Sequence, residues 1–392
     1  MYEQGQSILP LCCLLILFMS TIQKIKTGLY LHIPFCSQKC FFCSFVVCVA
    51  RLHRADEYLD CLSREAQRYA GTIIDTVYVG GGTPTLLDEN QLVRLLGIIK
   101  KNFRLKKDGE FTIETNPDTL TFSKAKILRS SGVNRVSIGA QTFDNALLKF
   151  LGRTHRADDV ATCCEVSRRA GFKNVNVDMM FGFPRQSWER LEKDLSQAVA
   201  LRSEHVSLYD LTIDPHSRFY RVGPALPNSQ KRGELYAKAL SFLEKRSFFQ
   251  YEISNFAREG YASAHNTLYW ECENYIGLGI GAHSHLSGRR FWNIRELYPY
   301  IRRVQKGRIP IDGQETLGRQ RRLIEALLFG LRMNKGVDIT RLEQRSLCRF
   351  STRKKEQITR FVEQGFLVFE GPVLKTTFKG RLVLDELCGY LI

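Results

Sequence analysis

The chain has 392 residues, of which 44% are hydrophobic, enough for a large domain with a smaller one, and this composition excludes general disorder. Its formal net charge of +17 would suit nucleic acid, an anionic membrane surface or a polyacidic ligand. The basic residues are dispersed, with dense runs only at 319–322 and 353–355, so we expect no nucleic-acid partner.

The first apolar segment, Ile8–Met19, stands close to the start of the chain. About 12 residues would span only about 18 Å as a helix, so no stable membrane span is expected. The residues before this segment carry only Glu3, whereas a signal peptide needs positive charge there. We expect residues 1–27 to be an N-terminal extension and translation to begin at Met19.

From Gly28 onward, short β-branched or aromatic runs alternate about six times with longer amphipathic stretches, a pattern typical of parallel sheets. Asp88 with Gln91 three residues later resembles a capping box, and Gly132 and Gly171 stand where two helices should end. Strands are predicted at Gly28–Ile33, Thr76–Gly80, Phe111–Glu114, Arg135–Ile138, Asn174–Met179 and His205–Tyr209. Residues 28–215 therefore predict an α/β fold, a partial (β/α)6 barrel with functional residues at the carboxyl ends of the strands.

The alternation fades after about Pro215. Residues 216–315 are expected to mix helix, strand and loop and to close over the barrel mouth, as a cap over a bound substrate. The stretch RRLIEALLFGLR predicts a helix near Arg319, and Phe361–Phe378 resembles a helix with a short hairpin. Residues 316–392 are thus expected to form a small, mostly helical, winged-helix-like domain.

Seven of the twelve cysteines occur in closely spaced groups, Cys12/Cys13, Cys36/Cys40/Cys43 and Cys163/Cys164, which suit disulfide geometry poorly and favour a reducing, cytoplasmic location. The sequence CSQKCFFC places Cys36, Cys40 and Cys43 on a loop after the first strand, so three thiolates can face one point. A closed zinc site needs four ligands, normally from two separated pairs, and no second CxxC motif or paired histidine motif is present. An iron-sulfur cluster held by three cysteines would keep one iron open, with His32 and Cys48 as nearby candidates for a fourth ligand.

The segment YLHIPFCSQKCFFCSF (30–45) resembles the radical S-adenosylmethionine (SAM) superfamily, specifically its anaerobic coproporphyrinogen III oxidase-like branch. The resemblance continues through VYVGGGTPTLL, ETNPD, VSIGAQTF, LGRTH and NVDMMFGFP, each at the end of a predicted strand. It implies a 4Fe-4S cluster on the three cysteines, SAM at the open iron, and an electron donor that reduces the cluster. Phe41, Phe42 and Phe45 would shield the cluster.

The chemistry of SAM indicates which residues should surround it. Glycines 80–82 allow close approach to the backbone, carboxylates suit the cationic sulfonium and ammonium groups, and arginine suits the carboxylate. The resemblance assigns SAM contacts to Tyr30, Phe42, Gly81, Gly82, Thr83, Glu114, Gln141, Arg153 and Asp178.

Two functions compete within this branch. One is oxidative decarboxylation of coproporphyrinogen III to protoporphyrinogen IX, and the other is that of the heme chaperone HemW family, which binds heme and transfers it to acceptor proteins. The oxidase motif resembles CxxxCxxCxC and the oxidase has a longer N-terminal segment, whereas this chain has Phe45 at the last position and at most 29 residues before Tyr30. The segment HNTLYW (265–270) matches the HNxxYW pattern of the chaperone group, although Ser44 replaces its usual Asp.

The chaperone resemblance predicts heme as a bound cofactor or cargo, with His265 as its iron ligand. His283 and His285 are further candidates to face the porphyrin. The sequence leaves radical turnover, and with it enzymatic activity, undecided.

Overall fold

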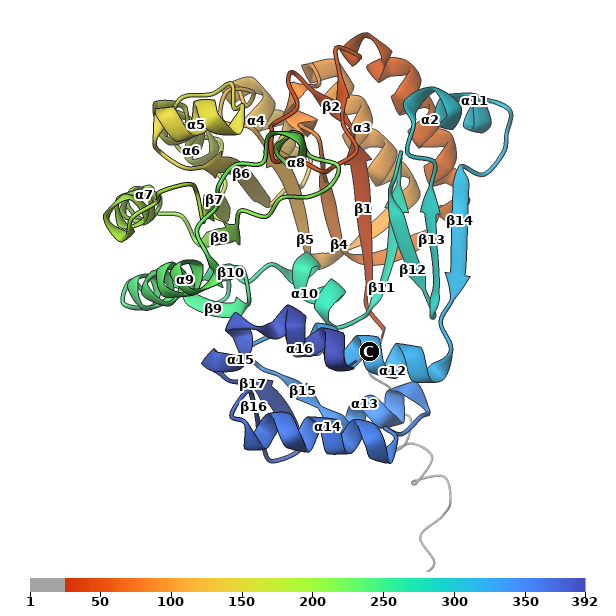
Figure 1. Cartoon of the computed structure of the whole chain (residues 1–392). Coiled ribbons are helices and arrows are strands. Elements are labelled where there is room, and N and C mark those ends of the chain that lie inside the picture. Colours follow the sequence, from red (N-terminus) through yellow and green to blue (C-terminus); the bar gives the residue numbers. More distant parts are fainter. Residues whose placement is uncertain (1–24, 392) are drawn as a thin grey trace, which may run out of the picture.

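The computed structural model describes residues 25–391, so Ile8–Met19 and the proposed start at Met19 lie outside the described residues. Its centre is a twelve-stranded sheet in the order β14-β13-β12-β11-β1-β4-β5-β6-β7-β8-β10-β9 (Figure 1). The six predicted strands are present as parallel neighbours: β1 (Thr27–Ile33), β4 (Thr72–Gly81), β5 (Phe103–Thr115), β6 (Arg135–Gln141), β7 (Val175–Phe181) and β8 (His205–Asp210). The predicted α/β fold is therefore confirmed.

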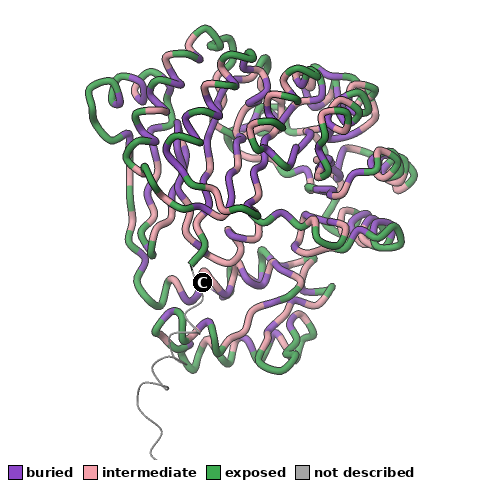
Figure 2. The backbone as a smooth tube through the Cα atoms, turned by 180° about the vertical axis from the view of Figure 1, so that it is seen from behind, coloured by how far each residue is buried: buried purple, intermediate pink, exposed green. Residues whose placement is uncertain are grey.

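Helices connect these strands and bury an apolar face against them. They are α2 (Ala55–Ala66), α3 (Glu89–Asn102), α4 (Phe122–Ser130), α5 (Asn145–Leu151), α6 (Ala157–Arg169) and α7 (Trp188–Ala200), with short 3-10 turns at Leu52–Arg54, Gln67–Tyr69 and Pro84–Leu86. The predicted capping box begins α3, where Asp88 accepts from the Gln91 backbone N–H at 2.8 Å and Gln91 Oε1 accepts from the Asp88 N–H. Gly132 and Gly171 follow α4 and α6 with φ of +99° and +94°. Figure 2 shows burial concentrated on the central strands, with exposed residues along the outer helices.

The expectation that residues 216–315 close over the barrel mouth is met only in part. The segment around α8 (Arg218–Val222) reaches the mouth, where the Phe219 N–H donates to the Phe41 carbonyl at 2.8 Å, and Gly281, Ala282, His283 and Arg295 line a cavity beside the cysteine loop. The strands of this region extend the sheet at both edges, because added strands pair the backbone groups that an open edge would leave free. At one edge lie β9 (Phe249–Glu252) and β10 (Asn255–Ala257); at the other lie β11 (Asn274–Leu278), β12 (His283–Leu286), β13 (Arg289–Asn293) and β14 (Ile311–Thr316).

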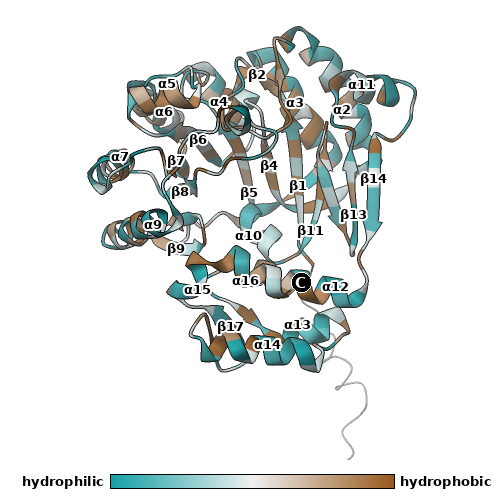
Figure 3. Cartoon of the chain, viewed as in Figure 1, coloured by the Kyte–Doolittle hydropathy of each residue, from teal (hydrophilic) through white to brown (hydrophobic). Residues whose placement is uncertain are grey.

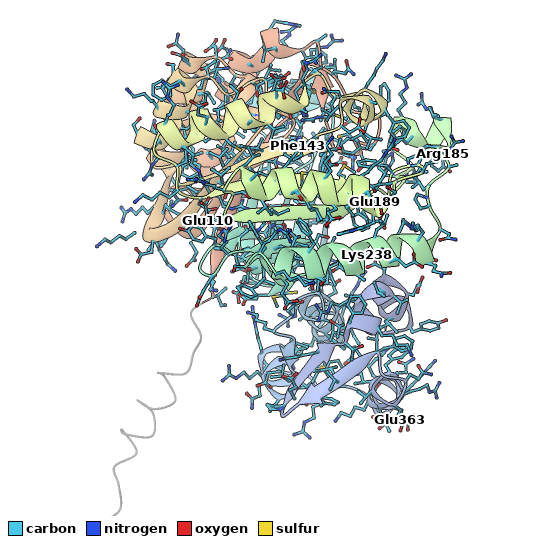
Figure 4. All side chains as sticks on the ribbon, turned by 90° about the vertical axis from the view of Figure 1, so that its left-hand side faces the viewer. Glu110, Phe143, Arg185, Glu189, Lys238 and Glu363 are labelled. Atoms are coloured by element: carbon cyan, nitrogen blue, oxygen red, sulfur yellow. The ribbon has the colours of Figure 1, made fainter. Side chains whose placement is uncertain are left out.

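Three further helices from this region pack around the sheet and its helices. They are α9 (Ser229–Glu244), α10 (Ala264–Trp270) and α11 (Leu297–Gln305). Figure 4 shows α7 and α9 lying side by side over one edge, and Trp188 meets Phe242 edge-on at 6.1 Å between them. In Figure 1, α10 lies at the opposite end of β1 from the short strand β2 (Phe35–Cys36).

The C-terminal part forms a smaller unit with its own hydrophobic core, which includes Leu323, Leu327, Phe350, Leu374 and Leu391. It contains α12 (Arg319–Gly330), β15 (Val337–Asp338), α13 (Ile339–Ser346), α14 (Thr352–Glu363), the hairpin of β16 (Leu367–Glu370) and β17 (Val373–Thr376), α15 (Phe378–Leu382) and α16 (Leu384–Leu391). Figure 3 shows α16 largely hydrophobic and α14 largely hydrophilic, as expected for an inner and an outer helix. Between residues 25 and 391, no helix combines the length and apolar character that a membrane span requires.

Candidate functional site

A cavity of about 400 Å³ lies at the carboxyl ends of the parallel strands. It is lined by the three motif cysteines and by eight of the nine residues predicted to contact SAM: Phe42, Gly81, Gly82, Thr83, Glu114, Gln141, Arg153 and Asp178. These residues come from segments more than 140 positions apart in the chain. The parallel sheet brings them together because each follows, or ends, a different strand.

The cysteine loop is fixed at both ends by the short parallel pairing of β2 with β3 (Cys48–Val49). Within the loop, the Phe41 N–H donates to the Leu151 carbonyl at 2.9 Å, and the Cys43 N–H donates to the Cys40 carbonyl at 3.2 Å. The loop is therefore held against α5, and its thiols face the cavity. Of the aromatic residues expected to shield it, Phe42 lines the cavity and Phe41 packs edge-on against Phe219, whereas Phe45 is 67% exposed.

The three thiols fit a cluster better than a single ion. Among residues 25–391, no three His, Cys, Asp or Glu side chains converge closely enough to hold one metal ion. A polynuclear cluster needs thiolates spaced around it, each bound to its own iron, and three cysteines lining one cavity meet that need. Burial raises the pKa of Cys36 to about 11, so a thiolate here requires the positive charge of bound iron.

Neither candidate for a fourth ligand lines this cavity. The two ring nitrogens of His32 are already used, since Nδ1 bonds with the Tyr30 hydroxyl at 3.0 Å and Nε2 with the Val46 carbonyl at 2.7 Å. Cys48 lies in β3 and is not among the residues that line the cavity, although its neighbour Val47 is. The arrangement thus suits a cluster with one iron left for an external ligand.

Glu114 is the buried carboxylate of the cavity. Its Oε1 accepts from the Tyr78 hydroxyl at 2.7 Å, and its Oε2 accepts from the Gly81 N–H at 3.0 Å. Burial raises the pKa of Glu114 to about 7, with Asp178 adding to the rise while Tyr78, Gly81 and Arg135 oppose it. A cationic ligand beside this carboxylate would favour its ionised form.

The second carboxylate, Asp178, is oriented by two neighbours in the barrel interior. Its Oδ2 accepts from the Ser137 hydroxyl at 2.9 Å, and its Oδ1 accepts from Asn176 Nδ2 at 2.8 Å. The two carboxylates lie on different strands but line the same cavity. They make that wall acidic, which suits the sulfonium and ammonium of SAM.

The opposite requirement, a cation for the ligand carboxylate, is met by Arg153. Its Nη2 donates to Asn116 Oδ1 at 2.9 Å and to the Gly139 carbonyl at 2.7 Å, and its Nη1 donates to Cys40 Sγ at 3.4 Å. Its Nε donates to His155 Nδ1 at 3.3 Å. These contacts hold the guanidinium beside the cysteine loop.

Gln141 has a buried side-chain oxygen that no described residue satisfies. Its backbone has φ of +63°, which is unusual for a residue with a side chain, and its buried Oε1 has no hydrogen-bond partner among the described residues. An orphaned acceptor that lines the cavity suits a ligand with hydroxyl donors, such as a ribose. Strain of this kind tends to occur at functional sites.

The glycines, two of which line the cavity as expected for bare backbone beside a ligand, also allow close packing within the protein. A Cβ on Gly80 would meet the Glu114 carboxylate at 2.7 Å, and one on Gly81 would meet the His32 ring at 2.5 Å. A Cβ on Gly82 would meet the Phe35 carbonyl at 2.7 Å. The run therefore permits β4 to pack closely against Glu114, His32 and the start of the cysteine loop.

A second cavity of about 340 Å³ lies beside the first, and Ser44 and Phe45 line both. Tyr30, predicted to contact SAM, lines this second cavity instead. Its ring lies 6.3 Å from that of Tyr78 and nearly parallel to it. Tyr30 is thus placed behind the SAM-type cavity rather than in its wall.

His265 lies near the amino ends of the strands and is 1% exposed. Its Nδ1 bonds with the Thr76 hydroxyl at 2.7 Å and its Nε2 with the Tyr269 hydroxyl at 2.9 Å, so neither nitrogen is free to ligate iron in this structure. Burial lowers the pKa of His265 to about 3. The structure therefore does not place His265 as an available heme ligand, and Tyr269, which it holds, lines the second cavity.

Several functional residues were not predicted from the sequence. Asn116 and Gly139 fix Arg153, and Tyr78 fixes Glu114. Asn116 stands inside the quoted ETNPD segment, so its polar side chain at a strand end could have indicated it. Tyr78 stands inside the quoted VYVGGGTPTLL segment, but it lies within β4 among apolar residues, so it resembled an ordinary strand residue.

Two family models match the chain: the radical SAM superfamily over residues 30–198 and the HemN C-terminal domain over residues 317–383. The chain is 36% identical to the heme chaperone HemW of Lactococcus lactis subsp. lactis (strain IL1403), over 90% of this chain and 93% of that protein. It is 34% identical to the heme chaperone HemW of Bacillus subtilis (strain 168), over 92% and 97%. Among solved structures, coproporphyrinogen III oxidase (HemN) from Escherichia coli superposes with a TM-score of 0.83 at 24% identity, over 95% of this chain and 92% of that chain. This last likeness concerns the fold alone.

Proposed function

Because the chain belongs to the HemW family of radical SAM proteins, we propose that it is a heme chaperone that binds heme and transfers it to acceptor proteins. The observation that carries the proposal is identity to such chaperones above 30% along nearly the whole chain, both domains included. The proposed compartment is the cytoplasm, as the cysteine pattern predicts.

The proposal includes a 4Fe-4S cluster on Cys36, Cys40 and Cys43, with SAM held at the open iron. When bound, the cluster supplies one-electron reduction, for which an external electron donor is needed. Among this chain's residues, Glu114 and Asp178 would neutralise the cationic groups of SAM, Arg153 would pair with its carboxylate, and the other cavity residues would shape its site.

Heme transfer and porphyrinogen oxidation can be separated by one pair of assays. Anaerobically reconstituted protein is titrated with heme and then mixed with an apo-acceptor, while a parallel sample receives SAM, a reductant and coproporphyrinogen III. We expect saturable heme binding, loss of heme to the acceptor, and no protoporphyrinogen. Accumulation of protoporphyrinogen would overturn the chaperone proposal in favour of the oxidase.

A further inference from the structure

The second cavity has a wall suited to a flat apolar ring. Tyr30, Tyr269, Tyr275 and Val46 line it, and Phe45, which is 67% exposed, stands between it and the SAM-type cavity. Aromatic side chains of this kind offer large apolar surfaces with polar tips, which favour a planar ligand with polar edges. Its volume of about 340 Å³ is near the lower limit for small-molecule pockets, about 300–1,000 Å³.

The cavity also contains a cation without a partner. Arg295 lines it, is exposed, and makes no hydrogen bond or ion pair with any residue from 25 to 391. An unpaired guanidinium beside an apolar pocket suits a carboxylate on the ligand, since arginine can bind both carboxylate oxygens.

Two described histidines line this cavity, and His283 is the one whose ring nitrogens make no hydrogen bond. Its ring stacks on Trp292 at 5.7 Å with an interplanar angle of 26°, and neither nitrogen is hydrogen-bonded within the described part of the chain. His32, which also lines the cavity, uses both nitrogens. A neutral imidazole nitrogen facing an open pocket is a common ligand for heme iron.

Resting on the proposed function, we propose that the second cavity holds one edge of the heme, with His283 as the axial iron ligand and Arg295 paired with a propionate. Phe45 covers the ring face toward the SAM-type cavity. Because the cavity is small and open, part of the heme stays accessible, which suits a cargo that must be handed on.

The same geometry gives His265 a positioning role. Its Nε2 bonds with the hydroxyl of Tyr269, which lines the second cavity, while His265 itself does not line that cavity. Loss of His265 should therefore weaken heme binding through the wall, while the coordination of any heme that does bind remains that of His283.

The test compares full-length wild type, His283→Ala and His53→Ala by anaerobic heme titration followed through the Soret band. His53 is an exposed histidine that lines neither cavity, so it is the matched control. His283→Ala should weaken heme binding at least about tenfold and change the spectrum of the bound heme, because even indirect supports of a metal ligand are worth about 10- to 100-fold. Metal-free protoporphyrin IX should bind equally to wild type and His283→Ala, since it has no iron to ligate, whereas Arg295→Gln should weaken both ligands.

The experiment distinguishes failure of the proposed function from failure of the His283 assignment. If wild type binds no heme, the proposed function fails. If wild type binds heme and His283→Ala keeps its affinity and spectrum, this assignment is overturned while the chaperone proposal stands. A His265→Gln variant that alone loses the wild-type spectrum would transfer the ligand role to His265.

Discussion

The raised pKa of Glu114 predicts that SAM binds more tightly as the pH rises from 6 to 8. In the free protein, burial holds the pKa of this carboxyl at about 7, so at pH 6 most molecules carry it protonated and neutral. A cationic ligand favours the ionised carboxylate, so binding must first remove the proton. The apparent Kd is then multiplied by 1 + 10^(pKa − pH), which is about 11 at pH 6 and about 1.1 at pH 8, a gain of about tenfold or ~1.4 kcal/mol.

The assay is equilibrium binding of radiolabelled SAM to cluster-reconstituted protein under anaerobic conditions at pH 6, 7 and 8. The amino group of SAM also titrates near this range, so the informative quantity is the ratio of affinities between wild type and Glu114→Gln. We expect Glu114→Gln to lack the carboxylate component, so the ratio should move about tenfold in favour of wild type from pH 6 to pH 8. A ratio that stays constant over this range would refute the assignment of Glu114 as the titrating partner of the ligand.

Three further predictions concern the architecture of the site. Replacing Cys36 with Ser should lower the iron content of reconstituted protein several-fold, measured per chain, whereas Cys348→Ser, away from the cavity, should leave it unchanged. Gly82→Ala should destabilise the protein by about 1–3 kcal/mol in urea unfolding, because its Cβ would meet backbone atoms at 2.7 Å, while Gly97→Ala, on an open helix surface, should be neutral or stabilising by up to about 1 kcal/mol. Arg153→Lys should weaken SAM binding about tenfold with little change in melting temperature, because a lysine cannot reproduce the forked contacts, and an unchanged SAM affinity would contradict its assigned role.

The predictable part of the fold was the part with strong local periodicity. The six parallel strands and the capping box of α3 follow from alternating apolar runs and short-range hydrogen bonding, which depend on neighbouring residues. The placement of residues 216–315 depends instead on which sheet edge accepts each short strand. That choice is made by long-range pairing, such as β11 joining β1 from about 245 positions away, and no local pattern encodes it.

The same distinction applies to the site. Strand-end motifs brought eight of the nine predicted SAM contacts to one cavity, because the ends of parallel strands converge. Tyr30 lies inside β1, and its side chain faces the neighbouring cavity. Tyr30 faces the same side of the sheet as its neighbour Tyr78, which lines the SAM-type cavity, so the position of β1 around the sheet decides which cavity Tyr30 lines, and the motif alone does not specify that position.

His265 of the HNTLYW motif can affect ligand binding without contacting the ligand. Glu110, labelled in Figure 4, accepts hydrogen bonds from the Ala264 and His265 N–H groups at 2.9 and 3.1 Å, so a β5 carboxylate fixes the start of α10. His265 then positions Tyr269 in the wall of the second cavity, and Trp270 packs under Arg332 of the C-terminal unit at 5.0 Å. A single short helix thereby joins the sheet, the cavity wall and the C-terminal unit. Both nitrogens of the buried His265 are engaged in this joint, whereas an iron ligand must keep a nitrogen free, and within the second cavity that condition is met by His283.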